Sequence, residues 1–334
     1  MFEFLGLSLL LAALLTFNSC ASLITEGLWR LFHGATHHWS ALSRSRFIFL
    51  LRTLPALVAV VCILLLFAPA YLVYEPRHTQ ENVSLKLALL AFASAIGIAL
   101  AAARSIIAWR KTVRLTADWT AQGELIEVSG VDIATYRINH AFPVIAIVGV
   151  LRPRLFIASQ VLTLLTPAEI KASLAHENWH LTSRDNLKRG VLRACRDSLL
   201  LVPCGSLLDR EWAEAAEAAA DEQAAGAGHG VALDLASALV KIARIIPPGA
   251  RPTMPAGVFL LGDDEANGIR GRVSRLMELA ASGNQQQGSA RFSSNVFALS
   301  STVLMVTTLL LITRHPVVFV TVHALIEQAV ALLK

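Results

Sequence analysis

The sequence predicts an α-helical membrane protein with four transmembrane helices and an α+β domain inserted between the third and the fourth. Hydrophobic residues make up 55% of the 334 residues, only 16% are charged, and the mean hydropathy is +0.57. A soluble globular protein carries about 25% charged residues. The apolar residues are also concentrated in a few long runs, whereas residues 115–291 have the mixed composition of one folded domain.

Four segments are apolar over about the 20 residues that a helix needs to cross a bilayer. They are residues 4–24, 53–74, 87–103 and 292–313. The third is slightly short, but Ile106, Ile107 and Trp109 extend it past Arg104, whose side chain is long enough to reach the interface. The first lacks the basic n-region of a signal peptide, so we expect it to be a retained span.

The basic residues that flank the spans predict the orientation, because cytoplasmic loops carry an excess of Lys and Arg. The loop expected at 25–50 and the segment after the third span are richer in basic residues than the loop between the second and third spans. We therefore expect residues 1–114 to hold three spans with their N-terminus outside and the 25–50 loop in the cytoplasm. Residues 115–291 then form a cytoplasmic domain, 292–314 the fourth span, and 315–334 an external or membrane-surface tail.

The domain at 115–291 begins with strand patterns and continues with helix patterns. Residues 124–128 alternate polar and apolar, and the apolar runs 144–150 and 154–158 flank a short turn, which predicts a hairpin. Thr166, Pro167 and Glu169 predict the start of a helix, as the cap, the first helical residue and the third residue after the cap. Further helices are expected at 186–200, 210–225, 231–245 and 269–281.

The helix that begins near Pro167 contains the sequence His176-Glu177-Asn178-Trp179-His180. At 3.6 residues per turn, His176 and His180 share one face of the helix and can bind the same metal ion. Glu177 lies about 100° around the helix, where it can accept a proton from a metal-bound water. This is the HExxH pattern of zinc peptidases.

A third metal ligand is expected on the Ala-rich helix at 210–225, because catalytic zinc usually has three protein ligands and one open position. Glu214, Glu217 and Asp221 share one face of that helix. With Glu217 as the ligand, Asp221 lies one turn later and can accept the free ring N–H of a ligand histidine. With Glu214 as the ligand, Ala218 would occupy that place, so Glu217 is preferred. The prediction is one Zn²⁺ ion per chain.

Other residues are candidates for supporting roles. Asp185 either steadies the metal-binding helix or caps the next one. An extended peptide substrate is expected to bind along the edge of the strand formed by Val144, Ile145, Ala146, Ile147 and Val148. Tyr136, His140 and His229 are candidates for stabilising an oxyanion, although an ordinary loop or surface position suits each of them better.

Residues 176–180 together with EAAAD at 217–221 resemble the HExxH…ExxxD signature of the gluzincin peptidases. Three further segments narrow the resemblance, GVLRPRL at 149–155, HLTSRD at 180–185 and RGRVSRL at 270–276. They are similar to segments of the membrane metallopeptidases typified by the β-lactam-sensing antirepressor peptidases of bacteria. The order of spans and domain fits as well, and the resemblance covers about residues 1–314.

The resemblance implies a gluzincin-like zinc endopeptidase of the bacterial inner membrane that cleaves a cytosolic or membrane-proximal protein in regulatory signalling. The matching positions are the zinc ligands His176, His180 and Glu217, the general base Glu177 and the supporting carboxylate Asp221. There are two departures. Asn178 stands where these helices usually have an apolar residue, and only about 20 residues follow the fourth span, so we expect neither an external penicillin-binding sensor domain nor β-lactam sensing.

Three other functions compete with a regulatory peptidase. One is a protease for membrane-protein quality control, and another is a catalytically silent signalling or scaffold protein on the same fold. A small transporter is disfavoured, because the spans contain few ionisable residues beyond Arg104. Binding to nucleic acid is not expected, because the chain has no long run of Lys and Arg. The expected partners are a protein substrate and the lipid bilayer.

Overall fold

The computed structural model describes residues 2–36, 38–77, 83–128, 130–199, 204–246, 265–282, 307–308 and 315–333. Three helical segments are long and apolar enough to cross a membrane, namely Phe2–Thr36, Ala41–Tyr74 and Leu85–Gln122. Each of them contains one of the first three predicted spans. The predicted fourth span, 292–313, lies outside the described residues except for 307–308.

The apolar helices extend well beyond the predicted spans. α1 (Phe2–Phe32) continues into η1 (His33–Thr36), and α2 (Ala41–Cys62) begins directly after the capping residue Ser40. The segment 25–50 is therefore mostly helix, and the prediction of a loop there was wrong. Residues 41–52 include basic side chains that pair with carboxylates of the domain, as Arg44 does with Glu211 and Arg52 with Asp209. Because these residues are polar, they were assigned to a loop.

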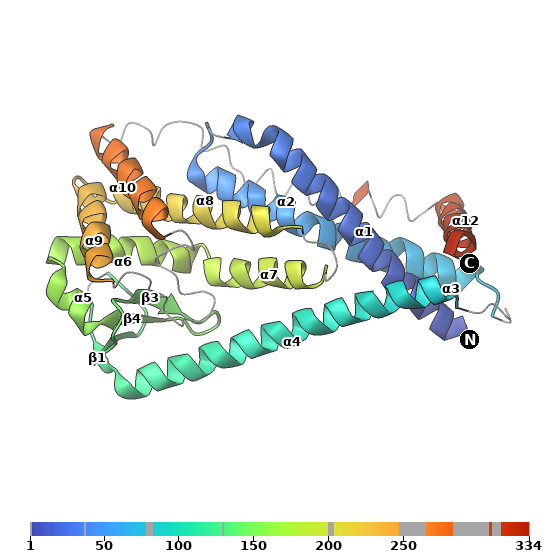
Figure 1. Cartoon of the computed structure of the whole chain (residues 1–334), viewed down its shortest axis with the longest axis horizontal. Coiled ribbons are helices and arrows are strands. Elements are labelled where there is room, and N and C mark those ends of the chain that lie inside the picture. Colours follow the sequence, from blue (N-terminus) through green and yellow to red (C-terminus); the bar gives the residue numbers. More distant parts are fainter. Residues whose placement is uncertain are drawn as a thin grey trace.

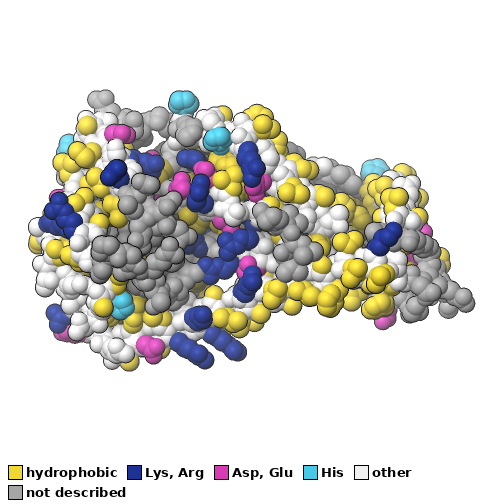
Figure 2. Space-filling model, in the orientation of Figure 1, with side chains coloured by type: hydrophobic (Ala, Val, Ile, Leu, Met, Phe, Trp, Pro, Cys, Tyr) yellow, Lys and Arg dark blue, Asp and Glu magenta, His cyan; other side chains and the backbone are white. Residues whose placement is uncertain are grey.

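One end of the molecule is formed by apolar helices and the other by the sheet and its covering helices (Figure 1). α2 continues through a π-helical segment, η2 (Ile63–Phe67), into α3 (Ala68–Tyr74). α4 (Leu85–Gln122) is a single helix of 38 residues that runs from α3 to the sheet (Figure 1). Figure 2 shows the same division, with hydrophobic side chains predominating beside α3 and charged ones gathered toward the sheet.

Four short strands form one sheet in the order β1-β2-β4-β3. Their bounds are β1 Glu124–Ile126, β2 Thr135–Ile138, β3 Ile145–Val148 and β4 Arg154–Ala158. β3 and β4 form the predicted antiparallel hairpin, with Ile147 opposite Leu155, whereas β2 pairs with β4 in parallel. β2 was not predicted from the sequence. β3 lies at one edge of the sheet that the structure describes.

The remaining described helices follow the sheet. They are α5 Ser159–Leu164, α6 Pro167–Thr182, α7 Asp185–Asp197, α8 Ser206–Ala225, α9 Val231–Ile245, α10 Glu265–Ala281 and α12 Pro316–Leu333. The core between sheet and helices includes Trp119 of α4, whose ring lies 5.1 Å from that of Phe156 in an edge-to-face arrangement. The third apolar helix thus ends inside the core of the domain.

The first two apolar helices also hold α8. The Arg52 side chain of α2 is only 2% exposed and donates a hydrogen bond to Asp209 at 3.1 Å. The Glu26 carboxylate of α1 accepts the backbone N–H of Gly205, just before α8, at 2.7 Å. Gly205 has a φ of +94°, and a Cβ there would lie 2.4 Å from the Arg52 guanidinium, so this junction requires glycine.

The start of α6 is fixed by the predicted capping box between Thr166 and Glu169. Glu169 also accepts hydrogen bonds from Ser237 at 2.5 Å and from Lys241 at 2.8 Å, which ties α6 to α9. Burial alone would raise the pKa of Glu169, but the bonds from Lys241, Ser237 and the Thr166 amide outweigh it and lower the pKa to about 2.

Glu169→Ala is expected to lower the free energy of unfolding by about 3 kcal/mol at neutral pH, the equivalent of the lowered pKa. Because the folded pKa lies below the ordinary glutamate value of 4.5, this contribution is present above about pH 5 and is lost as the pH falls toward 2. Thermal unfolding in detergent at pH 7 and pH 3 measures it. Glu278→Ala, at an exposed position of α10, is the control. If Glu169→Ala lowers the stability by the same amount at pH 7 and at pH 3, the prediction is contradicted.

Candidate metal centre

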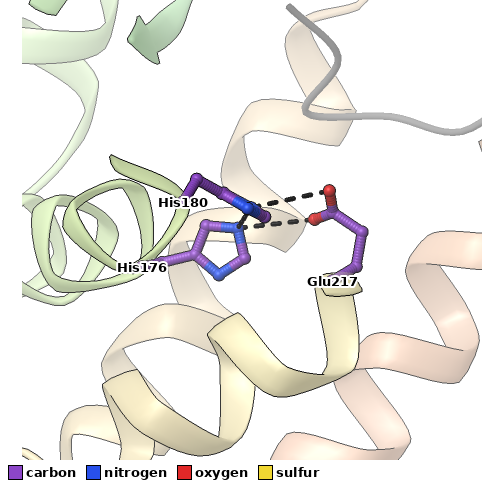
Figure 3. A group of neighbouring side chains, drawn as sticks. All are labelled: His176, His180 and Glu217. Carbon is purple, nitrogen blue, oxygen red and sulfur yellow. Dashed lines mark hydrogen bonds and ion pairs between the residues drawn. The ribbon is translucent and has the colours of Figure 1, made fainter. Parts of the chain in front are cut away.

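His176 and His180 project from α6 toward Glu217 on α8 (Figure 3). The two Nε2 atoms are 3.2 Å apart, and the Glu217 carboxylate oxygens lie 3.4 Å from His176 Nε2 and 3.6 Å from His180 Nε2. The three residues form one of two groups, among the described residues, whose ligand atoms could hold a metal ion. The structure thus brings all three predicted ligands together.

These distances suit a small tetrahedral metal ion. Zinc–nitrogen and zinc–oxygen bonds are about 2.0–2.2 Å long, so two ligand atoms on a tetrahedron lie about 3.3–3.6 Å apart. The three observed separations of 3.2, 3.4 and 3.6 Å fall in or next to this range. No large rearrangement of α6 against α8 is needed for the three atoms to bind one ion.

Each imidazole is oriented by a carboxylate behind it. His176 Nδ1 lies 3.0 Å from Asp221 Oδ1, and His180 Nδ1 lies 2.8 Å from Asp185 Oδ2. In the neutral tautomer that places the proton on Nδ1, both Nε2 lone pairs point toward the Glu217 carboxylate. Two lone pairs and an anionic oxygen converging on one point repel each other, so the site favours a positive charge at its centre.

The electrostatics of the site also favour a positive charge at His180. Burial would lower the pKa of His180, but the carboxylates of Glu217 and Asp185 outweigh it and raise the pKa to about 10. The Glu217 pKa is held well below its ordinary value, because the positive groups around it outweigh its burial. The group formed by His176, His180 and Glu217 is therefore suited to a positive charge, either as a metal ion or as protons on the histidines.

Glu177 is buried on the side of α6 that faces β3. Burial raises the pKa of its carboxyl group, and both histidines and the Ile147 N–H, which donates a hydrogen bond to it, reduce the rise. A buried carboxylate beside three potential metal ligands is well placed to accept and release a proton.

β3, the predicted substrate strand, lies at the sheet edge next to α6, but one position of that edge is occupied. The Ile147 N–H is bonded to Glu177, and the Ile147 carbonyl accepts a hydrogen bond from Asn186 Nδ2 at 3.1 Å. The side chains of 144–148 are buried in the core. An incoming peptide strand would have to replace both of these hydrogen bonds.

Two arginines complete the site, and neither was expected there from the sequence. Arg272 of α10 donates to both oxygens of the Asp221 carboxylate, at 2.9 and 2.6 Å, and lies 3.3 Å from Glu217. Arg189 of α7 donates to Glu217 at 3.1 Å. Asp221 is fully buried, so the Arg272 fork both neutralises it and fixes its orientation toward His176. The only signal for Arg272 was its place in the RGRVSRL segment.

The remaining candidates take ordinary places in the fold. The Tyr136 ring stacks on Phe156 at 5.6 Å, and His140 Nδ1 accepts the backbone N–H of Phe142. His229 is exposed after the end of α8. Asn178 is exposed as well, which removes the physical objection to a polar residue inside the motif.

The candidate metal centre rests on this geometry. No protein-family model matches the chain, and no curated protein matches it in sequence. The features that remain are the three converging ligand atoms, the two carboxylates behind the imidazoles and the buried Glu177.

Asp221→Asn is expected to weaken zinc binding about 10- to 100-fold, because an amide no longer holds the His176 ring in its metal-binding tautomer. Competition with a chromophoric chelator, on protein in detergent, measures the affinity. Glu214→Gln on the same helix is the control, since the Glu214 side chain is 65% exposed. Unchanged affinity in a folded Asp221→Asn protein would show that this carboxylate does not support the metal.

Proposed function

We propose that this protein is a membrane-anchored zinc endopeptidase. One observation carries the proposal: two imidazole Nε2 atoms and a carboxylate converge at 3.2–3.6 Å, each imidazole is backed by a carboxylate, and Glu177 lies beside them on the same helix. Two nitrogen donors and one oxygen donor suit zinc better than magnesium or calcium. The resemblance of 176–180 and 217–221 to the gluzincin signature supports the same activity.

The chain's own residues have distinct tasks in this reaction. Zinc bound between α6 and α8 would supply a Lewis acid for peptide hydrolysis. Glu177 accepts a proton from the attacking water and delivers it to the leaving amine, as its raised pKa favours. Asp221 and Asp185 hold the histidine tautomers, while Arg272 and Arg189 fix the Glu217 carboxylate.

A peptide substrate would bind as an additional strand on the edge of β3. Its backbone would take over the hydrogen bonds that Ile147 now makes with Glu177 and Asn186. This exchange would release the Glu177 carboxylate at the moment when a scissile bond arrives. Substrate binding and the release of the general base are then one event, so Glu177 becomes available only when a substrate is bound.

The location of the substrate follows from the proposed orientation of the chain. The basic residues around the apolar helices favour a cytoplasmic domain. The cleaved protein would then be cytosolic or membrane-proximal, in regulatory signalling or in membrane-protein quality control. The bacterial inner membrane is the proposed location.

Glu177→Gln is expected to lower the rate of proteolysis by at least about 100-fold while zinc at the histidine site is retained, because it removes the general base and no ligand. Cleavage of casein and self-cleavage are followed on protein in detergent, together with bound zinc. Glu214→Gln should cleave like the wild type. If His176→Ala removes the zinc but the wild type shows no cleavage that depends on Glu177, the silent scaffold is favoured. If His176→Ala and His180→Ala bind as much zinc as the wild type, the proposed site is refuted.

The orientation predicts opposite signals from two reporter fusions. Alkaline phosphatase, which is active only outside the cytoplasm, should be active when fused after residue 82 and inactive when fused at residue 120. A fluorescent protein that folds only in the cytoplasm should show the reverse. Phosphatase activity from the fusion at residue 120 would place the domain outside.

A further inference from the structure

A second group of potential metal ligands lies at the end of the molecule that is remote from His176. Glu75, which follows α3, and His323 and Glu327 of α12 have ligand atoms within 4.8 Å of one another. α3 and α12 lie side by side at this end, far from α6 and α8 (Figure 1). The proposed peptidase reaction makes no use of these residues.

Apolar packing brings the two segments together. Val322, Ile326 and Val330 recur at every fourth position of α12 and are buried with Ala70 of α3 in one cluster. His323 and Glu327 follow the first two of these residues, also four apart, so they share a neighbouring face of the helix. The Glu75 carboxylate lies 3.9 Å from His323 Nδ1.

The environment of this group favours a bound cation. The Glu75 side chain is only 3% exposed, so its carboxylate is enclosed by the protein beside the His323 ring. His323 Nδ1 is buried and has no hydrogen-bond partner among the described residues. Glu327 brings a second carboxylate toward the same point, so one nitrogen donor and two oxygen donors converge there.

We propose that Glu75, His323 and Glu327 bind a second divalent metal ion of the zinc class. One imidazole and two carboxylates are donors that zinc, cobalt and manganese accept, whereas magnesium and calcium prefer oxygen donors alone. The ion would join α12 to the end of α3, two segments far apart in the sequence. In the orientation proposed above, it would bind on the outer side of the membrane.

The test is the number of zinc ions that the full-length protein binds in detergent after complete removal of metal. Equilibrium dialysis against buffered zinc should give two per chain for the wild type and one for the double variant His176→Ala, His180→Ala. His323→Ala should also bind one, at the peptidase centre. Glu327→Gln, at an exposed position, is a second variant in case His323→Ala does not fold, and its zinc binding at the second site should fall at least tenfold.

His315→Ala, which removes an exposed imidazole just before α12, is the control and should bind two ions. Zinc should also raise the thermal unfolding midpoint of the double variant, and the addition of His323→Ala should abolish this rise. A double variant that binds no zinc, or a His323→Ala protein that still binds two, would overturn the proposal. Both readouts are independent of proteolysis, so a failed peptidase assay does not affect them.

Discussion

The Glu217 carboxylate has to be compensated inside a helical layer that excludes most water, and the arrangement of that layer depends on this requirement. A buried charge is tolerated only where opposite charges and hydrogen bonds surround it. α6 supplies two imidazoles, and α7 and α10 supply Arg189 and Arg272. A shift of any one of these helices would leave a charge without its partner, so the site and the packing of the layer stabilise each other.

The apolar helices take part in the same arrangement. α8 carries Glu217 and Asp221 at its centre, while Glu26 and Arg52 of the first two apolar helices hold its N-terminal end. Trp119 anchors the third apolar helix in the core below the sheet. The domain is therefore not a separate unit on a flexible tether, and a movement of α1 against α2 would act directly on α8, the helix that carries Glu217.

The sequence predicted the parts of the site that depend on spacing within one helix. His176 and His180 are one turn apart on α6, and Glu217 and Asp221 one turn apart on α8, so helical periodicity alone placed each pair on one face. Arg189 and Arg272 could not be found in this way, because their contacts depend on how α7 and α10 pack. Asp185, left open between two roles, begins α7 and also accepts a hydrogen bond from His180. The helical extent of 25–50 was missed because its polar and basic residues were assigned to a connecting loop.

α4 is one unbroken helix of 38 residues, which makes it about 57 Å long at 1.5 Å per residue. If about 30 Å of this length crosses the hydrocarbon core, at most about 27 Å remains to hold the sheet away from the membrane. A helix of this kind is a fixed spacer. A membrane-anchored substrate would need roughly eight extended residues to cover the same distance. If the protein is the proposed peptidase, the length of α4 would then limit how close to the membrane such a substrate is cut.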